Sequence, residues 1–151
     1  MAKLKYRTVS QAKKRCWEMF SKYIRTRDAI RTTGIPEEAL CITCDRRYSI
    51  KELQAGHFLP GRHTSVLFDE RGVHAQCYGC NVMKNGNSIK YFRKMQTLYG
   101  DKVIEELEEL DTQVKQFKTF ELDELYEVFK VKLAELTPEK ILRGLQSVVE
   151  S

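Results

Sequence analysis

Apolar residues recur at helical spacing in the first part of the chain. From Trp17 to Ile24 they fall at intervals of three and four residues, which predicts a helix over residues 10–32 with Ser10 as its N-cap. Gly34 follows the last turn and is expected to end the helix. Basic side chains fall largely away from the apolar stripe, so the helix would offer one face to the core and another to solvent or nucleic acid.

Shorter apolar runs predict strands in the middle of the chain. Residues 53–59 are expected to form a short strand, residues 66–68 a second one, and residues 73–76 a third extended segment. A helical pattern begins at Cys80, is interrupted by a turn sequence and resumes over residues 88–99.

The rest of the chain is predicted to be helical. Patterns over residues 101–110 and 120–136 have apolar positions three and four residues apart, and Thr137-Pro138 is typical of a helix start. The expected fold class is therefore α+β and mostly helical. The only candidate boundary lies near Gly100, which divides residues 1–100 from an acidic helical tail, residues 101–151, that is either part of the same domain or a dimerisation element.

Charge is distributed unevenly about that boundary. The net charge is +5, but residues 1–100 hold 19 basic and 8 acidic side chains, and residues 101–151 hold 7 and 13. A basic excess of this kind is typical of proteins that bind phosphate backbones, although it can also be a merely solvated surface. The acidic tail is expected to face away from nucleic acid, to bind a partner or to form a homodimer.

No stretch of the sequence predicts membrane association or secretion. The chain has no run of the roughly 18–20 apolar residues that span a bilayer, so no membrane partner is expected. Its basic N-terminus lacks the apolar segment of a secretory signal. A reducing, cytoplasmic setting is therefore expected.

Four of the five cysteines form two Cys-x-x-Cys pairs, Cys41 with Cys44 and Cys77 with Cys80. Two such pairs can supply the four thiolates of a tetrahedral zinc site, and under reducing conditions this is favoured over disulfides, the alternative. Zinc with four thiolates has no open position, so it would hold structure and perform no chemistry. The fifth cysteine, Cys16, is expected to be a small buried apolar residue.

Two polar residues near the pairs suggest catalysis. His57 lies on the strand predicted over residues 53–59, and imidazole can take a proton from water near neutral pH. Asn81 directly follows a cysteine, and its amide oxygen suits magnesium or manganese. A histidine base and a divalent ion can together hydrolyse a phosphodiester. A packed histidine and a helix-capping asparagine remain the alternatives.

Taken together, the motifs around these residues resemble the HNH, or His-Me finger, nucleases. Within that group the chain is most similar to the phage NinG/Rap recombination proteins, and more widely to junction resolvases of the endonuclease VII type. The resemblance covers about residues 40–95. It rests on Cys41-x-x-Cys44, Ala55-Gly56-His57-Phe58, Val73-His74-Ala75-Gln76-Cys77-x-x-Cys80-Asn81, Lys84 and Gly86-Asn87.

The resemblance implies a zinc-stapled ββα-metal core and cleavage of branched DNA, such as D-loops or Holliday junctions, during recombination in the host cytoplasm. One structural zinc ion and a catalytic magnesium or manganese ion are implied. His57 falls on the general base and Asn81 on a ligand of the catalytic ion, with His74 as a further candidate ligand. The expected DNA contacts, from the resemblance and from the basic faces, are Lys84, Arg62, Lys13, Lys14 and Arg25.

One position departs from the family pattern. Many HNH nucleases carry a metal-binding acidic residue or histidine directly before the base, where this chain has Gly56. The candidates for a replacement ligand are Gln54, Asp69, Glu70 and His74. The departure also motivates a second hypothesis, a non-catalytic zinc-containing DNA-binding protein. A third is an adaptor whose acidic helices bind protein partners.

Overall fold

The structure is a computed structural model that describes residues 6–60 and 63–136 of the 151-residue chain. Arg62 and the helix predicted to begin at Thr137 lie outside the described residues. In chain order the elements are α1 (Val9–Thr33), β1 (Glu38–Leu40), β2 (Arg47–Ser49), η1 (Ile50–Glu52), β3 (Leu53–His57), η2 (Glu70–Gly72), β4 (Val73–Cys77), the π-helical turn η3 (Gly79–Met83), α2 (Ser88–Tyr99), α3 (Asp101–Asp111) and α4 (Thr119–Ala134). The mostly helical α+β class is confirmed.

Helix α1 forms as predicted, but its cap is different. Thr8, and not Ser10, is the N-cap: its hydroxyl accepts from the Gln11 N–H, and the Gln11 side chain accepts from the Thr8 N–H. At the other end Gly34 adopts a φ of 80° and its N–H reaches the carbonyl of Ile30. The helix predictions for residues 88–99, 101–110 and 120–136 are confirmed within two residues at each end.

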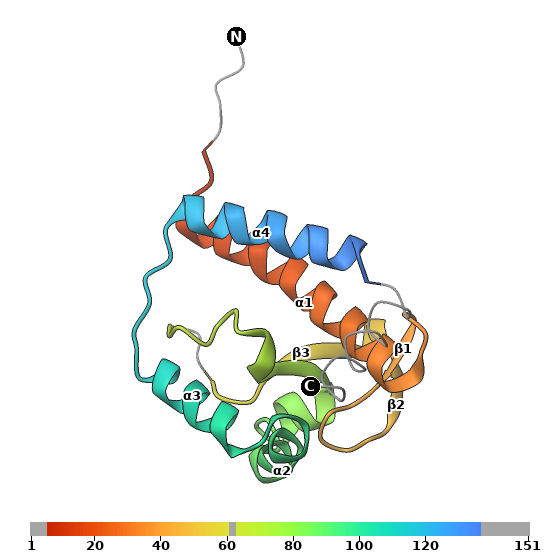
Figure 1. Ribbon diagram of the computed structural model, residues 1–151. Helices are drawn as coiled ribbons and strands as arrows, with labels where there is room; N and C mark the ends of the chain where they lie inside the picture. The colour runs from red at the N-terminus through yellow and green to blue at the C-terminus, as the bar shows by residue number, and fades with distance from the viewer. Residues whose placement is uncertain (1–5, 61–62, 137–151) are drawn as a thin grey trace, which may run out of the picture.

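Helices α1 and α4 lie side by side along one edge of the molecule, and the β3–β4 hairpin lies against the other side of α1 (Figure 1). The core between them is aromatic. The ring of Phe20 on α1 lies 4.7 Å from that of Phe129 on α4 and 5.5 Å from that of Phe68 in the loop before η2. Helices α2 and α3 cover a second cluster built around Tyr91, Met95 and Leu107. The hairpin is therefore enclosed by α1 on one side and by α2 on the other.

The strands form two separate antiparallel hairpins, β1–β2 and β3–β4. In β3–β4, Leu53 pairs with Cys77 and His57 pairs with Val73, which confirms the strands predicted around residues 53–59 and 73–76. The strand predicted over residues 66–68 is wrong. These residues form consecutive turns, in which the Leu67 N–H reaches the carbonyl of Thr64, and the apolar run is buried without a partner strand.

A buried ion pair fastens the hairpin to α1. Arg27 contacts Asp28 at 2.9 Å and donates to the carbonyls of Glu70 and Val73, each at 2.8 Å. The second oxygen of Asp28 accepts from the Ala75 N–H at 2.7 Å. Burial opposes ionisation of Asp28, but the Arg27 charge and these hydrogen bonds hold its pKa below the usual range. The pair therefore fixes where β4, and hence the second cysteine pair, lies relative to α1.

We expect Asp28→Asn to lower the free energy of unfolding by about 3–5 kcal/mol, because it leaves the buried Arg27 charge without its partner. Asp45→Asn is the matched control, since the exposed Asp45 carboxylate pairs only with Lys94 at the surface and should cost less than about 1 kcal/mol. Urea denaturation of both variants measures the difference. Equal costs for the two variants would contradict the assigned role of the buried pair.

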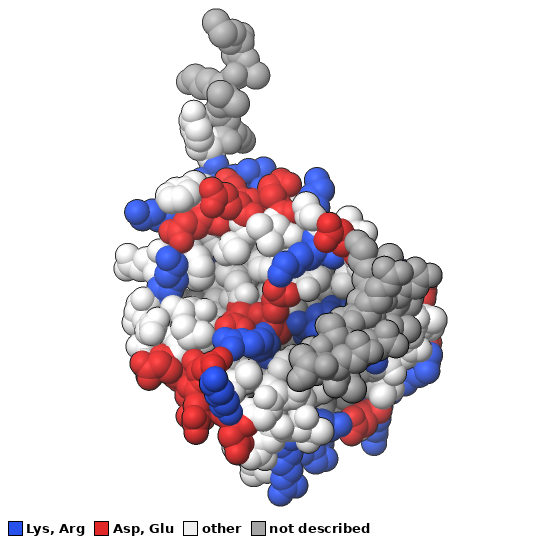
Figure 2. All heavy atoms as spheres, viewed as in Figure 1, with Lys and Arg blue, Asp and Glu red and all other residues white. Residues whose placement is uncertain are grey.

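Acidic and basic side chains gather on different elements. Figure 2 shows acidic groups over α4 and α3 and basic groups along the edge formed by α2. Helix α4 nevertheless packs directly on the basic helix α1. Arg15 lies 3.5 Å from Asp123, and its guanidinium sits 3.5 Å from the centre of the Tyr126 ring. No helix within the described residues is both long and apolar enough to span a bilayer.

Candidate functional site

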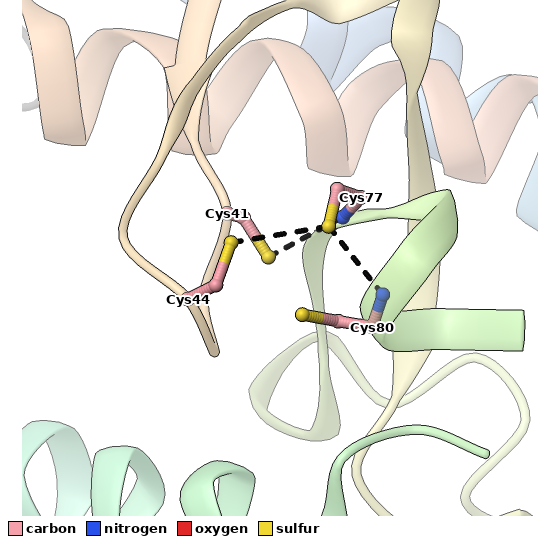
Figure 3. Close-up of side chains that lie close together, drawn as sticks. All are labelled: Cys41, Cys44, Cys77 and Cys80. Atoms are coloured by element: carbon pink, nitrogen blue, oxygen red, sulfur yellow. Dashed lines mark hydrogen bonds between the residues drawn. The ribbon is translucent and has the colours of Figure 1, made fainter. Parts of the chain in front are cut away.

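The four paired cysteines converge between the two hairpins (Figure 3). Cys41 and Cys44 lie in the turn between β1 and β2, Cys77 ends β4 and Cys80 lies in η3. All four sulfur atoms lie within 4.8 Å of one another, and the Sγ atoms of Cys44 and Cys77 are 3.9 Å apart. A tetrahedral zinc ion with bonds of about 2.3 Å would separate its sulfur ligands by about 3.8 Å. The cluster could therefore hold a structural metal ion such as zinc.

Hydrogen bonds favour the thiolate form of Cys41, whereas burial opposes ionisation of Cys44 and Cys77. The N–H of Cys77 donates to Cys41 Sγ at 3.3 Å, and the N–H of Cys80 donates to Cys77 Sγ at 3.4 Å. Burial opposes ionisation of Cys41, but the bonds from Cys77 and Thr43 outweigh it and lower its pKa to about 7. Burial and the neighbouring Cys41 raise the pKa of Cys44 to about 12. Metal binding would therefore displace protons, because it requires all four thiols as thiolates.

His57 lies at the end of β3, half-buried against α1. Its ring stacks on Trp17, with the ring centres 5.1 Å apart and the planes 16° from parallel. Its Nε2 lies 3.0 Å from the carbonyl oxygen of Leu67. A carbonyl can only accept, so Nε2 carries the proton and Nδ1 is the basic nitrogen of the neutral ring. The orientation and tautomer of His57 are thus fixed by a loop and a helix outside its own strand.

His74 is enclosed in a directed chain of hydrogen bonds. Tyr91 donates its hydroxyl proton to the carbonyl of Gly56 at 2.6 Å, so it can only accept from His74 Nδ1, 3.1 Å away. His74 Nε2 then accepts from the hydroxyl of Tyr99 at 2.8 Å. Both ring nitrogens are occupied within the fold, which favours a structural role over metal binding. This series of hydrogen bonds ends at the carbonyl of Gly56, in the peptide group that precedes His57.

We expect the protonation of His74 to make stability depend on pH. Burial lowers the pKa of His74 to about 3, although the nearby Asp28 acts in the opposite direction. In the unfolded chain this ring takes a proton below about pH 6.5, so its contribution is present above that pH and is lost as the pH falls toward the folded pKa. The free energy of unfolding should fall by roughly 1.4 kcal/mol per pH unit below about 6.5. Urea denaturation at several pH values measures the free energy of unfolding of the parent and of His74→Gln. The same dependence of that free energy on pH in both proteins would contradict the prediction.

Gly56 is required by its neighbour on β4, Gln76. A Cβ atom at position 56 would lie 2.1 Å from Gln76 Oε1 and 3.0 Å from Gln76 Cβ. Gln76 cannot easily move away, because its Nε2 donates to the Thr43 hydroxyl at 3.1 Å and to the Gly86 carbonyl at 2.9 Å. The space that a metal-binding side chain would use at position 56 is therefore filled by an amide that links the first Cys-x-x-Cys turn to Gly86, beyond η3. We call the two Cys-x-x-Cys turns the knuckles. Within the described residues, Gln76 Oε1 is buried without a hydrogen-bond partner.

Adding a methyl group at this position is expected to destabilise the hairpin. We expect Gly56→Ala to lower the free energy of unfolding by about 1–3 kcal/mol, the usual cost of overpacking. Gly72→Ala is the matched control, because a Cβ there would meet Leu107 at an ordinary 3.5 Å. Chemical denaturation should also show that Gln76→Ala offsets part of the cost of Gly56→Ala. Additive costs would mean that the two positions do not compete for space.

The side chains of Asn81 and His57 contact opposite faces of the β3–β4 hairpin. Asn81 Nδ2 donates to Gln54 Oε1 at 2.7 Å. Because side chains alternate along a strand, Gln54 and Gly56 share one face of β3 and His57 lies on the other, against Trp17. The structure thus brings Asn81 to Gln54 and His57 to α1, and no hydrogen bond among the described residues joins Asn81 to His57.

A catalytic divalent ion would find mainly neutral ligands here. In the described part of the chain, only the four cysteines gather as three or more histidine, cysteine or acidic residues. Asp69 pairs with Arg71 at 2.9 Å and Glu70 with Lys132 at 2.5 Å, so both carboxylates already have cationic partners. The amide oxygens near Asn81 remain. Magnesium usually binds one or two carboxylates together with phosphate and water, and the amides near Asn81 supply no carboxylate.

The basic residues predicted to contact DNA have different surroundings. Lys84 directly follows η3 and is exposed, and Lys14 is exposed on α1. Lys13, also on α1, is half-buried. Arg25 turns into the fold, where it donates to the carbonyl of Ile50 at 2.9 Å. Sequence reasoning missed Arg46 and Lys90, which join Lys84 around a cavity beside the cysteines; the signal was their closeness to the two knuckles.

Comparison with known proteins identifies relatives. The family model described as "Bacteriophage Lambda NinG protein" matches residues 1–139. Proteins named "Protein ninG" are 30% identical over 111 residues in Escherichia phage 933W, and 29% identical over 111 residues in Escherichia phage lambda and Salmonella phage P22. These matches cover 70% of this chain and 51%, 50% and 50% of the relatives, so the chain spans about half their length. No solved structure matches the chain.

Proposed function

Because this chain belongs to the NinG family of bacteriophage lambda, and because its four cysteines gather at one end of the β3–β4 hairpin that also carries His57, we propose that it is a metal-dependent DNA endonuclease. It would act in recombination on branched DNA such as D-loops or Holliday junctions. The substrate class follows from the resemblance of residues 40–95 to HNH nucleases of the junction-resolving type. Zinc in the four-cysteine cluster would be structural, and magnesium or manganese would serve catalysis.

In this proposal His57 is the general base. Its Nδ1 would take the proton of the attacking water, and the Leu67 carbonyl would stabilise the resulting imidazolium by accepting from Nε2. Asn81 would turn its amide oxygen toward the divalent ion, which would supply charge stabilisation at the phosphate and the leaving oxygen. Lys84 would contact a backbone phosphate nearby.

The observation that carries the proposal is the fixed tautomer of His57. Its Nε2 lies 3.0 Å from a backbone carbonyl and its ring is stacked on Trp17, so a loop and a helix outside β3 orient the imidazole. Pairing a base with a second group that fixes its tautomer is the usual arrangement for a catalytic histidine. The joint action of His57 and Asn81 on one phosphate is supported by the family resemblance rather than by a contact between them.

The second candidate is a zinc-containing protein that binds DNA without cutting it. Gln76 favours this alternative, because it occupies the space of the metal-binding side chain that many HNH nucleases place at position 56. Such a protein would keep the zinc cluster and the basic surface, and it would show salt-sensitive binding without turnover.

The two candidates are separated by a cleavage assay on linear duplex, single strand, D-loop and four-way junction, each with magnesium, with manganese or with neither ion. The endonuclease proposal expects cutting that depends on the added ion and is fastest on a branched substrate. Binding to these DNAs without cutting under either ion would select the non-catalytic alternative.

A further inference from the structure

A cavity of about 320 Å³ opens onto the four-cysteine cluster and includes the side of the metal site formed by Cys44, Cys77 and Cys80; its volume is within the size range of ligand sites. It is distinct from the surroundings of His57, which faces α1 on the other side of the hairpin. Its walls combine the two knuckles with the beginning of α2. The lining residues are Cys44, Arg46, Tyr48, Cys77, Gly79, Cys80, Lys84 and Lys90.

Three cations and no carboxylate line this cavity. Arg46 comes from the turn of the first hairpin, Lys84 follows η3 and Lys90 lies in the first turn of α2. In the parts of the chain that the structure describes, none of the three forms an ion pair with an acidic side chain. By contrast, the nearby Lys94 is paired with Asp45. Zinc with four thiolates would carry a net charge of about −2, which three exposed cations around the same cavity more than offset, so they create a site for anionic groups.

The beginning of α2 adds to this positive potential. Its N-cap, Asn87, adopts a left-handed conformation and makes no side-chain capping bond. Its Nδ2 donates instead to Cys80 Sγ at 3.6 Å, and the first turn of the helix contains no acidic residue. An uncapped helix start with unsatisfied N–H groups favours an anion, and Lys90 of this turn lines the cavity.

Exposed apolar side chains are the sequence neighbours of two of the cations. Met83 and Ile89 are 75% and 70% exposed, and they directly precede Lys84 and Lys90 in the sequence. A small inorganic anion would gain nothing from contact with apolar side chains. A nucleotide strand would gain from it, because its sugars and unstacked bases pack on apolar side chains while its phosphates bind the cations.

We propose that this cavity, together with its apolar flank, is a DNA-binding site for a strand whose bases are not stacked in a continuous duplex. Arg46, Lys84 and Lys90 bind successive backbone phosphates, and Met83 and Ile89 contact the exposed bases or sugars. The inference rests on the DNA-binding part of the proposed function and not on catalysis by His57. The site lies on the two knuckles, so the structural metal would hold its walls in place.

The test measures DNA affinity against salt concentration for zinc-loaded protein without magnesium or manganese. The parent is compared with a triple variant, Arg46→Ala, Lys84→Ala and Lys90→Ala, and with the single variant Lys90→Glu. The matched control removes three exposed lysines elsewhere: Lys51→Ala, Lys102→Ala and Lys130→Ala. The probes are a four-way junction and a linear duplex of equal length, and zinc per chain is measured for each protein.

Each lost phosphate contact should reduce the slope of log affinity against log salt by about 0.7 for an unstacked strand and by about 0.9 for duplex. The triple variant should therefore lose about 2–3 in slope and about a hundredfold in affinity near 0.1 M salt, while the control changes far less. A salt slope in the triple variant equal to the parent's would overturn the proposal. If the triple variant also bound zinc more weakly, the role of the three cations would be to offset the charge of the thiolates. If the triple variant fails to fold, Lys90→Glu decides the question by the same measurement.

The apolar flank has its own readout. Met83→Ser with Ile89→Ser should reduce the preference for junction over duplex several-fold, without changing the salt slope. An unchanged preference would overturn the role of the flank. These binding results are independent of cutting. If the triple variant has a reduced salt slope but the parent never cuts DNA, the binding site is supported and the endonuclease proposal is refuted. If the parent cuts DNA but the triple variant keeps the parent's salt slope, the endonuclease proposal is supported and the binding site is refuted.

Discussion

Replacing Cys41 and Cys77 by serine is expected to unfold the region between the two hairpins. Each of these cysteines belongs to a different knuckle, so the double variant leaves one thiol on each side and no tetrahedral site. Structural zinc contributes on the order of 10–16 kcal/mol to small zinc modules, whereas a whole domain is stable by only about 5–15 kcal/mol. Loss of the ion should therefore remove protection from β3 and β4, which the knuckles hold together.

The measurement is hydrogen exchange of the β3 and β4 amides with zinc content determined in parallel. Cys16→Ala is the matched control, because Cys16 is fully buried on α1 away from the cluster and burial raises its pKa to about 12. The control should retain one zinc ion per chain and the protection of both strands. A serine double variant with unchanged protection would show that the hydrophobic core holds the hairpins without metal.

His57→Ala is expected to slow single-turnover DNA cleavage by about 10²- to 10⁴-fold, the usual contribution of a general base. The substitution removes the Nδ1 base and the contact with Trp17, but the alanine still fits the end of β3, so zinc content and DNA affinity should be retained. The measurement follows cleavage with enzyme in excess over DNA. His63→Ala is the matched control, since the His63 side chain is exposed in the loop before Thr64, and its backbone carbonyl accepts from the Lys115 N–H at 3.1 Å. Equal loss in both variants would remove His57 from the role of base.

Local patterns in the sequence predicted much of this fold. The helix periodicity around Phe20 and the turn signals at Gly34 and Gly100 specify elements that depend on residues close in the chain, whereas Ser88, which the sequence offered as a cap, is the first residue of α2 and not its N-cap. The β1–β2 hairpin was missed, because each strand is three residues long and pairing is fixed by the cysteine turn between them. The run at residues 66–68 was misread, because a buried turn and a buried strand need the same apolar side chains.

The candidate site was predictable as a set of residue types, but its arrangement was not. The Cys-x-x-Cys spacing predicted the cluster that could hold metal. By contrast, the Leu67 carbonyl fixes the tautomer of His57 from a loop ten residues away, and Gln76 explains Gly56 only once the register of the hairpin is known. The cavity lined by Arg46, Lys84 and Lys90 likewise forms only when the two knuckles close.

The central claim is tested most directly by measuring cleavage of a four-way junction by the parent protein and by His57→Ala, side by side, with and without manganese. The account predicts manganese-dependent cutting by the parent, cutting slowed by at least about a hundredfold in the variant, and equal binding and zinc content in both proteins. Binding of the junction by the parent without any cutting, or equal cutting by the two proteins, would contradict it.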